Sequence, residues 1–410
     1  MSLAKKVYAT PMLRFVVSVA VVVAVDAACL ASCQAESAPT SAPRAPATAS
    51  TAGAVTPTVA TVPGIKFPPA PFVIPAPSEP TALVAGVDLR TVSIEDLLRV
   101  KLTGTEPQRL AAGYALTYWT YRRAPESQTV GAGTVAVFAA RLQLVDEVFY
   151  WLQQAALHEG LDPESAKATS FARVHQDARW PNFLRYLENI SAVWRRSGYR
   201  RQPVIVPAGY TVGTPIAALI CLHGYGSRPE DFTSDDKLQR FVDDTGMAVV
   251  SLSATTPRGQ QSFMWSEQFE TDWTHIQKGL ALVKDRVTLA PSGNIAVGFS
   301  QGAQLGMELA VAHPEFFNGA IAMSPGYLGT PRLAAALAKG NKATAKQTYF
   351  VVWYDQERPA SVALAKRDVA ELRTAGARVI AHEYLGEYHT FAPDIDDNFA
   401  IWSQLLREKR

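Results

Sequence analysis

A serine set between two glycines constrains the fold of this chain more than any other feature. Gly298-Phe299-Ser300-Gln301-Gly302 follows the mostly apolar run Asn294-Ile295-Ala296-Val297. A glycine two residues either side of a serine permits a very tight strand-to-helix turn, where larger side chains would collide with neighbouring backbone. Five residues of this pattern also occur by chance, so the interpretation needs a strand before, a helix after and chemical partners elsewhere. With those, Ser300 is a candidate nucleophile.

The composition is that of a globular protein with room for two domains. The chain has 410 residues, of which 48% are hydrophobic and 19% charged. The formal net charge is +2, and Lys and Arg form no basic stripe that would neutralise phosphates. Nucleic acid is therefore not an expected partner.

The first 33 residues have the order of a secretory signal. Basic residues precede an apolar run over 15–25 that is too short to span a bilayer, and small residues follow. Leu30-Ala31-Ser32-Cys33 resembles the lipobox of bacterial lipoproteins, which implies a lipid on Cys33 and a membrane-anchored protein in the cell envelope, outside the cytoplasm. The alternative is an ordinary signal cleaved near the same place, with Cys33 incidental and the protein secreted or periplasmic.

Residues 34–84 are expected to be a linker. The sequence to about Pro80 is mainly Ala, Pro, Ser and Thr, a composition that buries little apolar area and favours extended conformations. The more apolar run Phe67 to Ile74 is a candidate for docking on the folded part. With Cys29 in the signal and Cys33 lipidated, Cys221 has no disulfide partner and is expected to be a small buried hydrophobe.

Residues 85–200 are expected to form a helical domain, because apolar residues recur at helical spacing and strand signals are scarce. Thr105-Glu106-Pro107 predicts one helix start and Trp180-Pro181 another. The aromatic residues on these helices are interpreted as core packing rather than a binding site. One long helix ending at Gly160 is predicted by a stripe at three- and four-residue steps: Val135, Phe138, Leu142, Val145, Phe149, Leu152 and Ala156.

After Arg201 short apolar runs alternate with helical stretches, which predicts an α/β domain over 201–410 with a doubly wound, mostly parallel sheet. Strands are expected over 203–207, 217–222, 247–252, 294–299, 319–323, 348–353 and 378–384. Helices are expected over 237–245, 269–287, 301–313 and 361–375. The stretch between Met323 and Thr348 has room for one helix near 333–339 but for no large cap.

His389 follows the last expected strand, and the carboxyl ends of strands are where such a sheet gathers its ligands. The order serine, acid, histidine along the chain is the one used by hydrolases built on this kind of sheet. His389 as general base would take the proton of Ser300 during attack and return it to the leaving group.

Residues from about 203 to 410 resemble the α/β-hydrolase superfamily, in particular the phospholipase/carboxylesterase family that includes the acyl-protein thioesterases. The resemblance rests on Ile205-Val206-Pro207-Ala208, Leu222-His223-Gly224-Tyr225-Gly226, the segment around Ser300, Thr374-Ala375-Gly376-Ala377 and Glu383-Tyr384. It implies an oxyanion hole formed by the backbone N–H groups of Tyr225 and Gln301. Trp265 matches a family aromatic near the substrate, and a core tryptophan is the alternative. No metal or organic cofactor is implied.

The acid departs from the family pattern, in which a glycine lies three residues before an aspartate (Gly-x-x-Asp) after the penultimate strand. Here Trp353-Tyr354-Asp355-Gln356-Glu357 offers two carboxylates. Counting back from the following helix without gaps favours Glu357, with Tyr354 at the usual glycine position. Asp355 has the commoner residue type but needs a two-residue shift.

The leading hypothesis is a serine hydrolase that cleaves small-molecule or lipid-like carboxylic esters through an acyl-enzyme on Ser300. The same residues could act on amides, thioesters or acyl groups of cell-wall or other polysaccharides. A third hypothesis, from a different class, is a binding protein on a hydrolase scaffold whose catalysis has lapsed. The sequence leaves the oligomeric state open.

Overall fold

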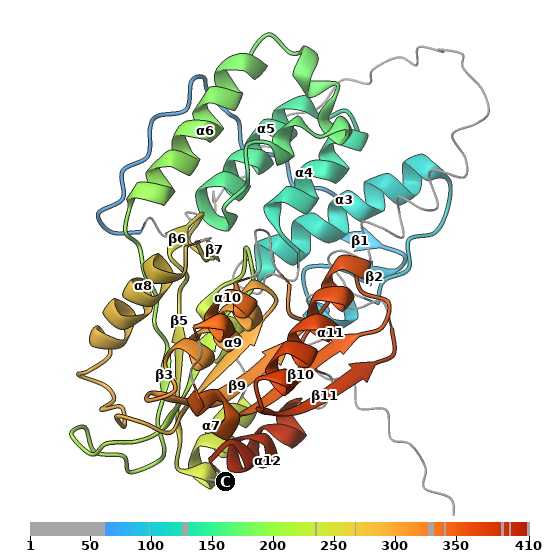
Figure 1. Cartoon of the computed structure of the whole chain (residues 1–410). Helices are drawn as coiled ribbons and strands as arrows, with labels where there is room; N and C mark the ends of the chain where they lie inside the picture. Colours follow the sequence, from blue (N-terminus) through green and yellow to red (C-terminus); the bar gives the residue numbers. More distant parts are fainter. Residues whose placement is uncertain are drawn as a thin grey trace, which may run out of the picture. The chain divides into compact units, whose positions relative to one another are not determined.

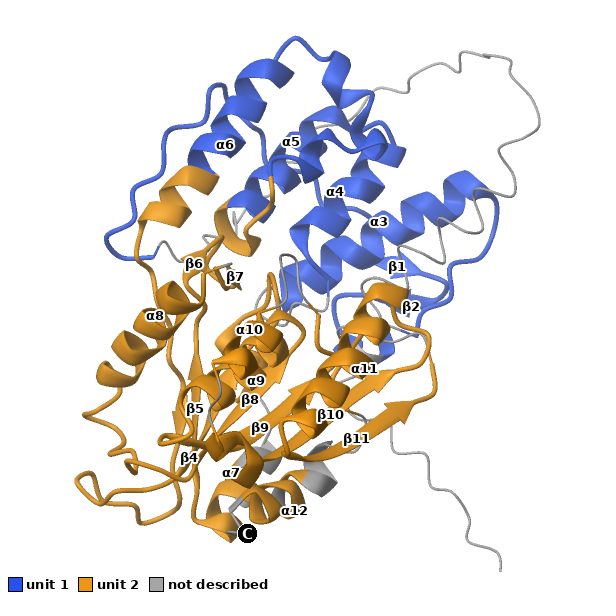
Figure 2. Ribbon diagram, in the orientation of Figure 1, with its two compact units in different colours: residues 1–156, 163–190 blue, residues 157–162, 191–410 orange. Residues whose placement is uncertain are grey.

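The structure is a computed structural model that describes residues 62–97, 99–124, 130–233, 236–266, 268–326, 332–339, 342–386, 389–392 and 395–407. The predicted signal, Cys29, the lipobox with Cys33 and the linker up to residue 61 lie outside these ranges. The chain divides into two compact units (Figure 2). Unit 1 comprises residues up to Ala156 and Pro163–Ile190, and unit 2 comprises Leu157–Asp162 and Ser191–Arg410.

A seven-stranded sheet forms the centre of unit 2 (Figure 1). Its spatial order is β11-β10-β9-β8-β4-β5-β3, in which β3 runs antiparallel to β5 and the other neighbours are parallel. All seven expected strands are present, and the α/β class is confirmed. They are β3 (Val204–Ile205), β4 (Ala218–Leu222), β5 (Ala248–Leu252), β8 (Asn294–Phe299), β9 (Phe317–Met323), β10 (Thr348–Tyr354) and β11 (Arg378–Tyr384).

Helices cover both faces of this sheet, which is why β4, β5, β8 and β10 are buried along their whole length and read as continuous apolar runs. One face carries α8 (Phe269–Ala281), α9 (Gln301–Ala312), α10 (Leu333–Ala338) and α11 (Pro359–Thr374). The other carries α7 (Asp236–Thr245) and α12 (Ile395–Arg407), the latter not predicted (Figure 1). A small hairpin pairs β6 (Thr256–Pro257) with β7 (Phe263–Met264).

The strand order reverses at β4, which lies between β5 and β8. The chain proceeds from β4 to β5 on one side and from β8 to β11 on the other. In open α/β sheets the ligand site lies at the carboxyl ends of the strands beside such a switch point. The sequence segments that follow β4 and β8 are His223-Gly224-Tyr225 and Ser300-Gln301.

Unit 1 is mainly helical. The pair β1 (Leu83–Val84) and β2 (Val87–Asp88) precedes α2 (Ile94–Leu97), α3 (Glu106–Arg123), α4 (Ala132–Arg141), α5 (Val145–Gln154) and α6 (Trp180–Arg196), whose last turns belong to unit 2. A π-helical turn over Ala155–Glu159 follows α5, and three 3-10 turns lie at Ser165–Lys167, Thr169–Phe171 and Val174–Gln176. Helices α3 and α6 begin where expected. Phe72 of the apolar linker run docks on Phe149 and Phe183, with ring centroids 5.2 and 6.1 Å away.

The prediction of one long helix from Val135 to Ala156 is wrong, because α4 and α5 are separate. Gln143, between them, has a left-handed backbone with φ of 63°. The Leu144 N–H donates to the Ala139 carbonyl, which satisfies the end of α4 and turns the chain. The break keeps Val135, Phe138, Phe149 and Leu152 buried, so the apolar stripe is real although the helix is not continuous.

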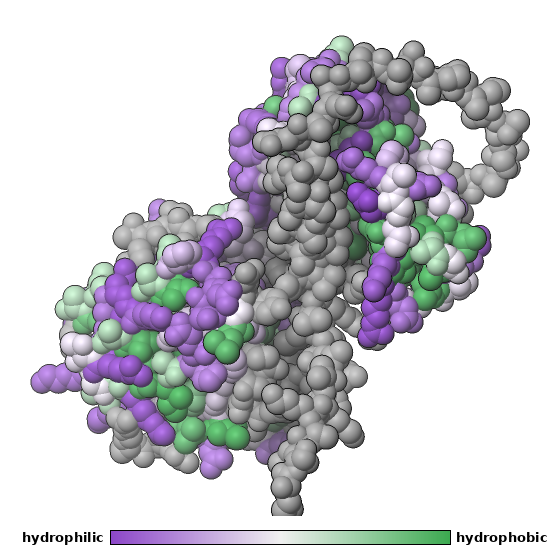
Figure 3. All heavy atoms as spheres, turned by 90° about the vertical axis from the view of Figure 1, so that its right-hand side faces the viewer, coloured by the Kyte–Doolittle hydropathy of each residue, from purple (hydrophilic) through white to green (hydrophobic). Residues whose placement is uncertain are grey.

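None of the described helices is long and apolar enough to span a bilayer. On the face drawn in Figure 3, hydrophilic and hydrophobic side chains are interspersed over the coloured surface.

Candidate active site

Ser300 lies at the turn between β8 and α9. Its backbone has φ of 54° and ψ of −120°, a conformation that non-glycine residues rarely adopt. The Ser300 N–H donates to the Met323 carbonyl at 3.0 Å, which ties the turn to the neighbouring strand. A Cβ at Gly298 would lie 2.2 Å from the Gly302 carbonyl oxygen, and one at Gly302 would lie 2.0 Å from the Leu222 carbonyl oxygen. Both glycines are therefore required by close backbone approach, as the sequence predicted.

Ser300, His389 and Glu357 form one chain of hydrogen bonds. The Ser300 Oγ lies 2.8 Å from His389 Nε2, and His389 Nδ1 lies 2.8 Å from Glu357 Oε2. The Glu357 side chain is 1% exposed, whereas that of His389 is 44% exposed. The imidazole is thus partly open to solvent, while the carboxylate behind it is shielded.

Glu357 also receives two donors that the sequence did not identify as a group. Its Oε1 lies 2.7 Å from the Ser324 hydroxyl and 3.0 Å from the Tyr354 backbone N–H. Ser324 follows β9, is buried and has a positive φ of 45°. Its position at the carboxyl end of a strand, like that of Ser300, was the signal that could have pointed to it.

Asp355, the alternative acid, is directed elsewhere. Its Oδ1 accepts the Gly386 N–H at 2.8 Å, and its own N–H donates to the Tyr384 carbonyl at 2.9 Å. These two bonds join the turn after β10 to the end of β11. The structure therefore brings Glu357, and not Asp355, to His389.

Aromatic rings support the imidazole from one side. Phe299 lies 5.0 Å from the His389 ring centroid and stacks on Phe391 at 4.7 Å, and Phe232 closes the row 5.0 Å from Phe391. On another side the backbone of Gly326 comes close, since a Cβ there would lie 3.5 Å from Ser300 Oγ and 3.6 Å from His389 Cε1. The glycine keeps space free beside the reactive hydroxyl.

The turn after β4 lies against the serine. A Cβ at Gly224 would be 3.2 Å from that of Ser300. The N–H groups of Tyr225 and Gln301 have no hydrogen-bond acceptor among the described residues. Gln301 begins α9, where N–H groups are unpaired and the helix dipole favours negative charge. They remain the two donors that the resemblance implies for an oxyanion hole.

Buried side chains hold this turn in place. Burial lowers the pKa of His223 to about 4 and keeps it neutral. Its Nδ1 then donates to the Gly224 carbonyl at 2.7 Å, and its Nε2 accepts the Ala254 N–H at 3.0 Å. The Trp265 indole donates to the His223 carbonyl at 2.8 Å. His223 is thus a scaffold residue of the turn.

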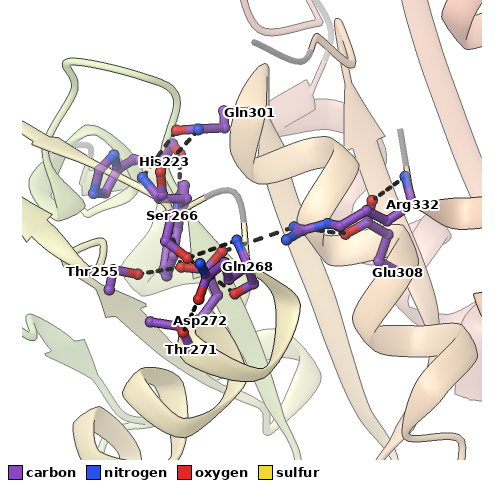
Figure 4. Close-up of polar contacts among 10 residues, drawn as sticks. His223, Thr255, Ser266, Gln268, Thr271, Asp272, Gln301, Glu308 and Arg332 are labelled. Atoms are coloured by element: carbon purple, nitrogen blue, oxygen red, sulfur yellow. Dashed lines mark hydrogen bonds and ion pairs between the residues drawn. The ribbon is translucent and has the colours of Figure 1, made fainter. Parts of the chain in front are cut away.

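Of the two interpretations of Trp265, a substrate contact and a core tryptophan, the structure supports the core position, with 0% exposure. Its backbone N–H and carbonyl pair with the Gln301 side-chain amide at 3.0 and 3.1 Å. Figure 4 shows the Gln301 side chain reaching toward the segment that carries Ser266. Trp265 therefore contacts Gln301 and His223, the residue that holds the turn after β4, rather than an open surface.

Two buried carboxylates, Glu308 on α9 and Asp272 on α8, lie close to one arginine. Arg332, the N-cap of α10, bonds Glu308 at 2.9 Å and lies 3.8 Å from Asp272 of α8 (Figure 4). Burial raises the pKa of both carboxyls, and the arginine opposes that shift. The ion pair with Glu308 anchors Arg332, at the start of α10, to α9, the helix that follows Ser300.

Cys221 takes no part in this site. Cys221 is fully buried, and burial raises the pKa of its thiol. Among the described residues, no three His, Cys, Asp or Glu side chains are grouped so as to hold a metal ion.

Comparisons with known proteins give one family and several solved structures. Residues 199–389 match the model of the Esterase family, described as "Putative esterase". No curated protein matches the sequence. Esterase PE8 is 22% identical over 50% of this chain and 99% of that chain, with a TM-score of 0.41. A carboxylesterase of Bacillus cereus is 18% identical over 53% of this chain and 99% of that chain, with a TM-score of 0.36. Acyl-protein thioesterase 2 of Zea mays is 16% identical over 51% of this chain and 100% of that chain, with a TM-score of 0.37.

Proposed function

We propose that the α/β domain of unit 2, in which residues 199–389 match the Esterase model, cleaves carboxylic esters through an acyl-enzyme on Ser300. The observation that carries the proposal is the continuous chain of hydrogen bonds from Glu357 through His389 to Ser300. A serine hydroxyl is a weak nucleophile until a base accepts its proton, and His389 is within reach to do so. The substrate class is a small-molecule or lipid-like ester.

In the proposed reaction, His389 Nε2 accepts the Ser300 proton while Oγ attacks the ester carbonyl carbon. The carbonyl electron pair moves to oxygen, and that oxyanion receives hydrogen bonds from the N–H groups of Tyr225 and Gln301. The bond to the alcohol oxygen then breaks, and His389 gives its proton to the departing alkoxide. Water repeats the sequence on the acyl-enzyme, releasing the carboxylic acid and restoring Ser300. Glu357 orients the imidazole and stabilises its cationic form.

The test is loss of the nucleophile. Ser300→Ala should lower hydrolysis of a short-chain chromogenic ester by at least about a thousandfold and abolish labelling by a fluorophosphonate. Its free energy of unfolding should remain close to that of the natural chain, since Oγ contributes one hydrogen bond to the fold. Undiminished turnover, or a label recovered on another serine, would contradict the mechanism.

We also propose that the enzyme is anchored outside the cytoplasm by a lipid on Cys33. The support comes from the sequence: the signal-like first 33 residues, the lipobox and the proline-rich tether that follows. Replacing Cys33 with Ser should move the protein from the membrane fraction to the soluble fraction. Unchanged fractionation would remove the lipid anchor and leave the hydrolase proposal intact.

A further inference from the structure

Unit 2 contains a cavity that is separate from the triad. It has a volume of about 620 Å³ and lies between α8 and the segments before β3 and after β5. A cavity of this size accommodates a small organic molecule. Its lining includes Arg200, Glu270, Thr274, His275, Lys278 and Leu282. None of these residues takes part in the proposed reaction.

Arg200 is the most informative of these residues. Its guanidinium donates to the backbone carbonyls of Tyr199 at 2.7 Å and Thr255 at 2.9 Å. Among the described residues it forms no ion pair with a carboxylate, and burial lowers its pKa. A guanidinium has five N–H donors, so donors remain for an occupant of the cavity. A partly buried cation without a counter-charge is costly, and a bound anion would remove that cost.

The remaining charges on the cavity wall also favour an anion. Lys278 is exposed and forms no ion pair within the described chain. His275 points Nε2 at the Ser253 carbonyl at 2.8 Å, and burial lowers its pKa to about 4, with Arg200 and Lys278 lowering it further. It is therefore neutral near pH 7. Glu270 is the carboxylate among the lining residues, so two permanent cations outnumber one anion.

One end of the cavity is apolar. Leu282 lines it and leaves 60% of its surface exposed, so its aliphatic side chain is open to an occupant. Gly279, one turn earlier on α8, adds no side chain and lies over Leu252. We propose that this cavity binds a small amphiphilic carboxylate, with its carboxyl group at Arg200 and Lys278 and its hydrocarbon part on Leu282.

The inner wall of the cavity is connected to the scaffold of the oxyanion turn. Thr255, whose carbonyl accepts from Arg200, gives its hydroxyl to Asp272, and Asp272 Oδ1 accepts the Ser266 N–H at 2.8 Å (Figure 4). Ser266 directly follows Trp265. An occupant would therefore contact Thr255, which is linked through Asp272 and Ser266 to the neighbour of Gln301, Trp265, without reaching Ser300.

Calorimetric titration of the full chain with hexanoate tests the proposal. Binding should be detectable at about 10 mM ligand, while hexanol and hexylammonium should bind at least about tenfold more weakly. Arg200→Gln and Lys278→Met should each weaken hexanoate binding about tenfold or more, the effect of one charge-assisted hydrogen bond. Lys284→Met, an exposed lysine beyond α8, is the matched control and should bind hexanoate normally.

Three results would overturn the proposal: no heat with hexanoate, equal binding of hexylammonium, or unchanged affinity in both charge variants. A further arm separates the cavity from the triad, because labelling Ser300 with a fluorophosphonate should leave hexanoate binding intact. Loss of binding on labelling would assign the ligand to the triad instead. Inorganic phosphate as a second probe distinguishes a general anion site, since equal binding of phosphate would remove the role of Leu282. Lys278→Met keeps the test valid if Arg200→Gln fails to fold.

Discussion

The two carboxylates that follow β10 lie two residues apart and have different surroundings. Glu357 is shielded from solvent and touches His389, Ser324 and the Tyr354 N–H, whereas Asp355 holds the turn at Gly386. A carboxylate that orients an imidazole and stabilises its charge is needed in the transition state, and a turn-forming carboxylate is not.

Replacing each acid by its amide should therefore have unequal effects on ester turnover. Glu357→Gln preserves shape but not charge, and kcat should fall on the order of 10²- to 10⁴-fold. Asp355→Asn is the matched control, with less than about a tenfold change, because an amide oxygen still accepts the Gly386 N–H. Steady-state kinetics of both variants decides, and the reverse order of effects would assign the acid to Asp355.

Ser324 is expected to act by positioning Glu357. Its single proton can go to the carboxylate at 2.7 Å or to the Thr390 carbonyl at 3.0 Å, and the charged acceptor is favoured. Removing the hydroxyl should lower kcat/KM about tenfold, because the carboxylate loses a donor that holds it in position behind His389. Ser324→Ala and Ser324→Gly should agree, although only glycine suits the positive φ. An effect confined to alanine would mean that backbone strain is responsible.

At the scale of elements, helix α9 approaches the sheet unusually closely at its first turn. Gly302 leaves no room for a Cβ beside the Leu222 carbonyl, while a Cβ at Gly306 would be 3.6 Å from that of Ala296, an ordinary contact. The two glycines lie one turn apart on the same helix, but only Gly302 is required by close backbone approach.

Gly302→Ala should lower the free energy of unfolding by more than about 3 kcal/mol or prevent folding, because strand and helix must separate. Gly306→Ala should be neutral or stabilising by up to about 1 kcal/mol, since alanine favours helix. Urea unfolding of the two variants measures the difference. Equal stability of both variants would mean that the strand-to-helix turn at Ser300 tolerates a wider geometry than the structure shows.

Over the whole molecule, buried histidines couple stability to pH. Burial lowers the pKa of His158, His223 and His275 to about 4 in the folded chain. In the unfolded chain histidine titrates near about 6.5, so unfolding takes up protons between these values. The free energy of unfolding should therefore fall as pH decreases from about 6.5 to 4, by up to about 1.4 kcal/mol per pH unit for each histidine.

Asp368 partly offsets this loss, because burial raises its pKa to about 6 and the folded state holds its proton longer than the unfolded state. Urea unfolding between pH 7 and 5 measures the net slope. His158→Gln should reduce this slope, because it removes one buried neutral histidine. A slope that is the same in the natural chain and in this variant would show that His158 is not buried in the neutral form.

The sequence was sufficient to predict the strands of the sheet, because strands buried on both faces are continuous apolar runs. It was also sufficient to predict the tight turn at Ser300, because that turn requires glycines at fixed positions. It could not separate α4 from α5, since Gln143 adopts a left-handed turn without the glycine that usually marks one. It left Glu357 and Asp355 as alternatives because both precede the same helix and only the approach of His389 distinguishes them. Ser324 was missed because its contact with Glu357 joins residues far apart along the chain.

The chain passes between the two units three times, because Leu157–Asp162 belongs to unit 2 although the residues on either side belong to unit 1. Within unit 2, the His158 carbonyl accepts the Gln261 N–H, and the backbone of Gly160 lies against Gly259 in the β6–β7 hairpin. A proteolytic cut after Ile190 would therefore leave Leu157–Asp162 of unit 2 on the same fragment as unit 1, and a truncation starting at Ser191 would strip a contact from the hairpin. Removing residues 1–190 as one block would therefore also remove Leu157–Asp162 from unit 2, so a design that keeps unit 2 alone must replace the contacts of this segment.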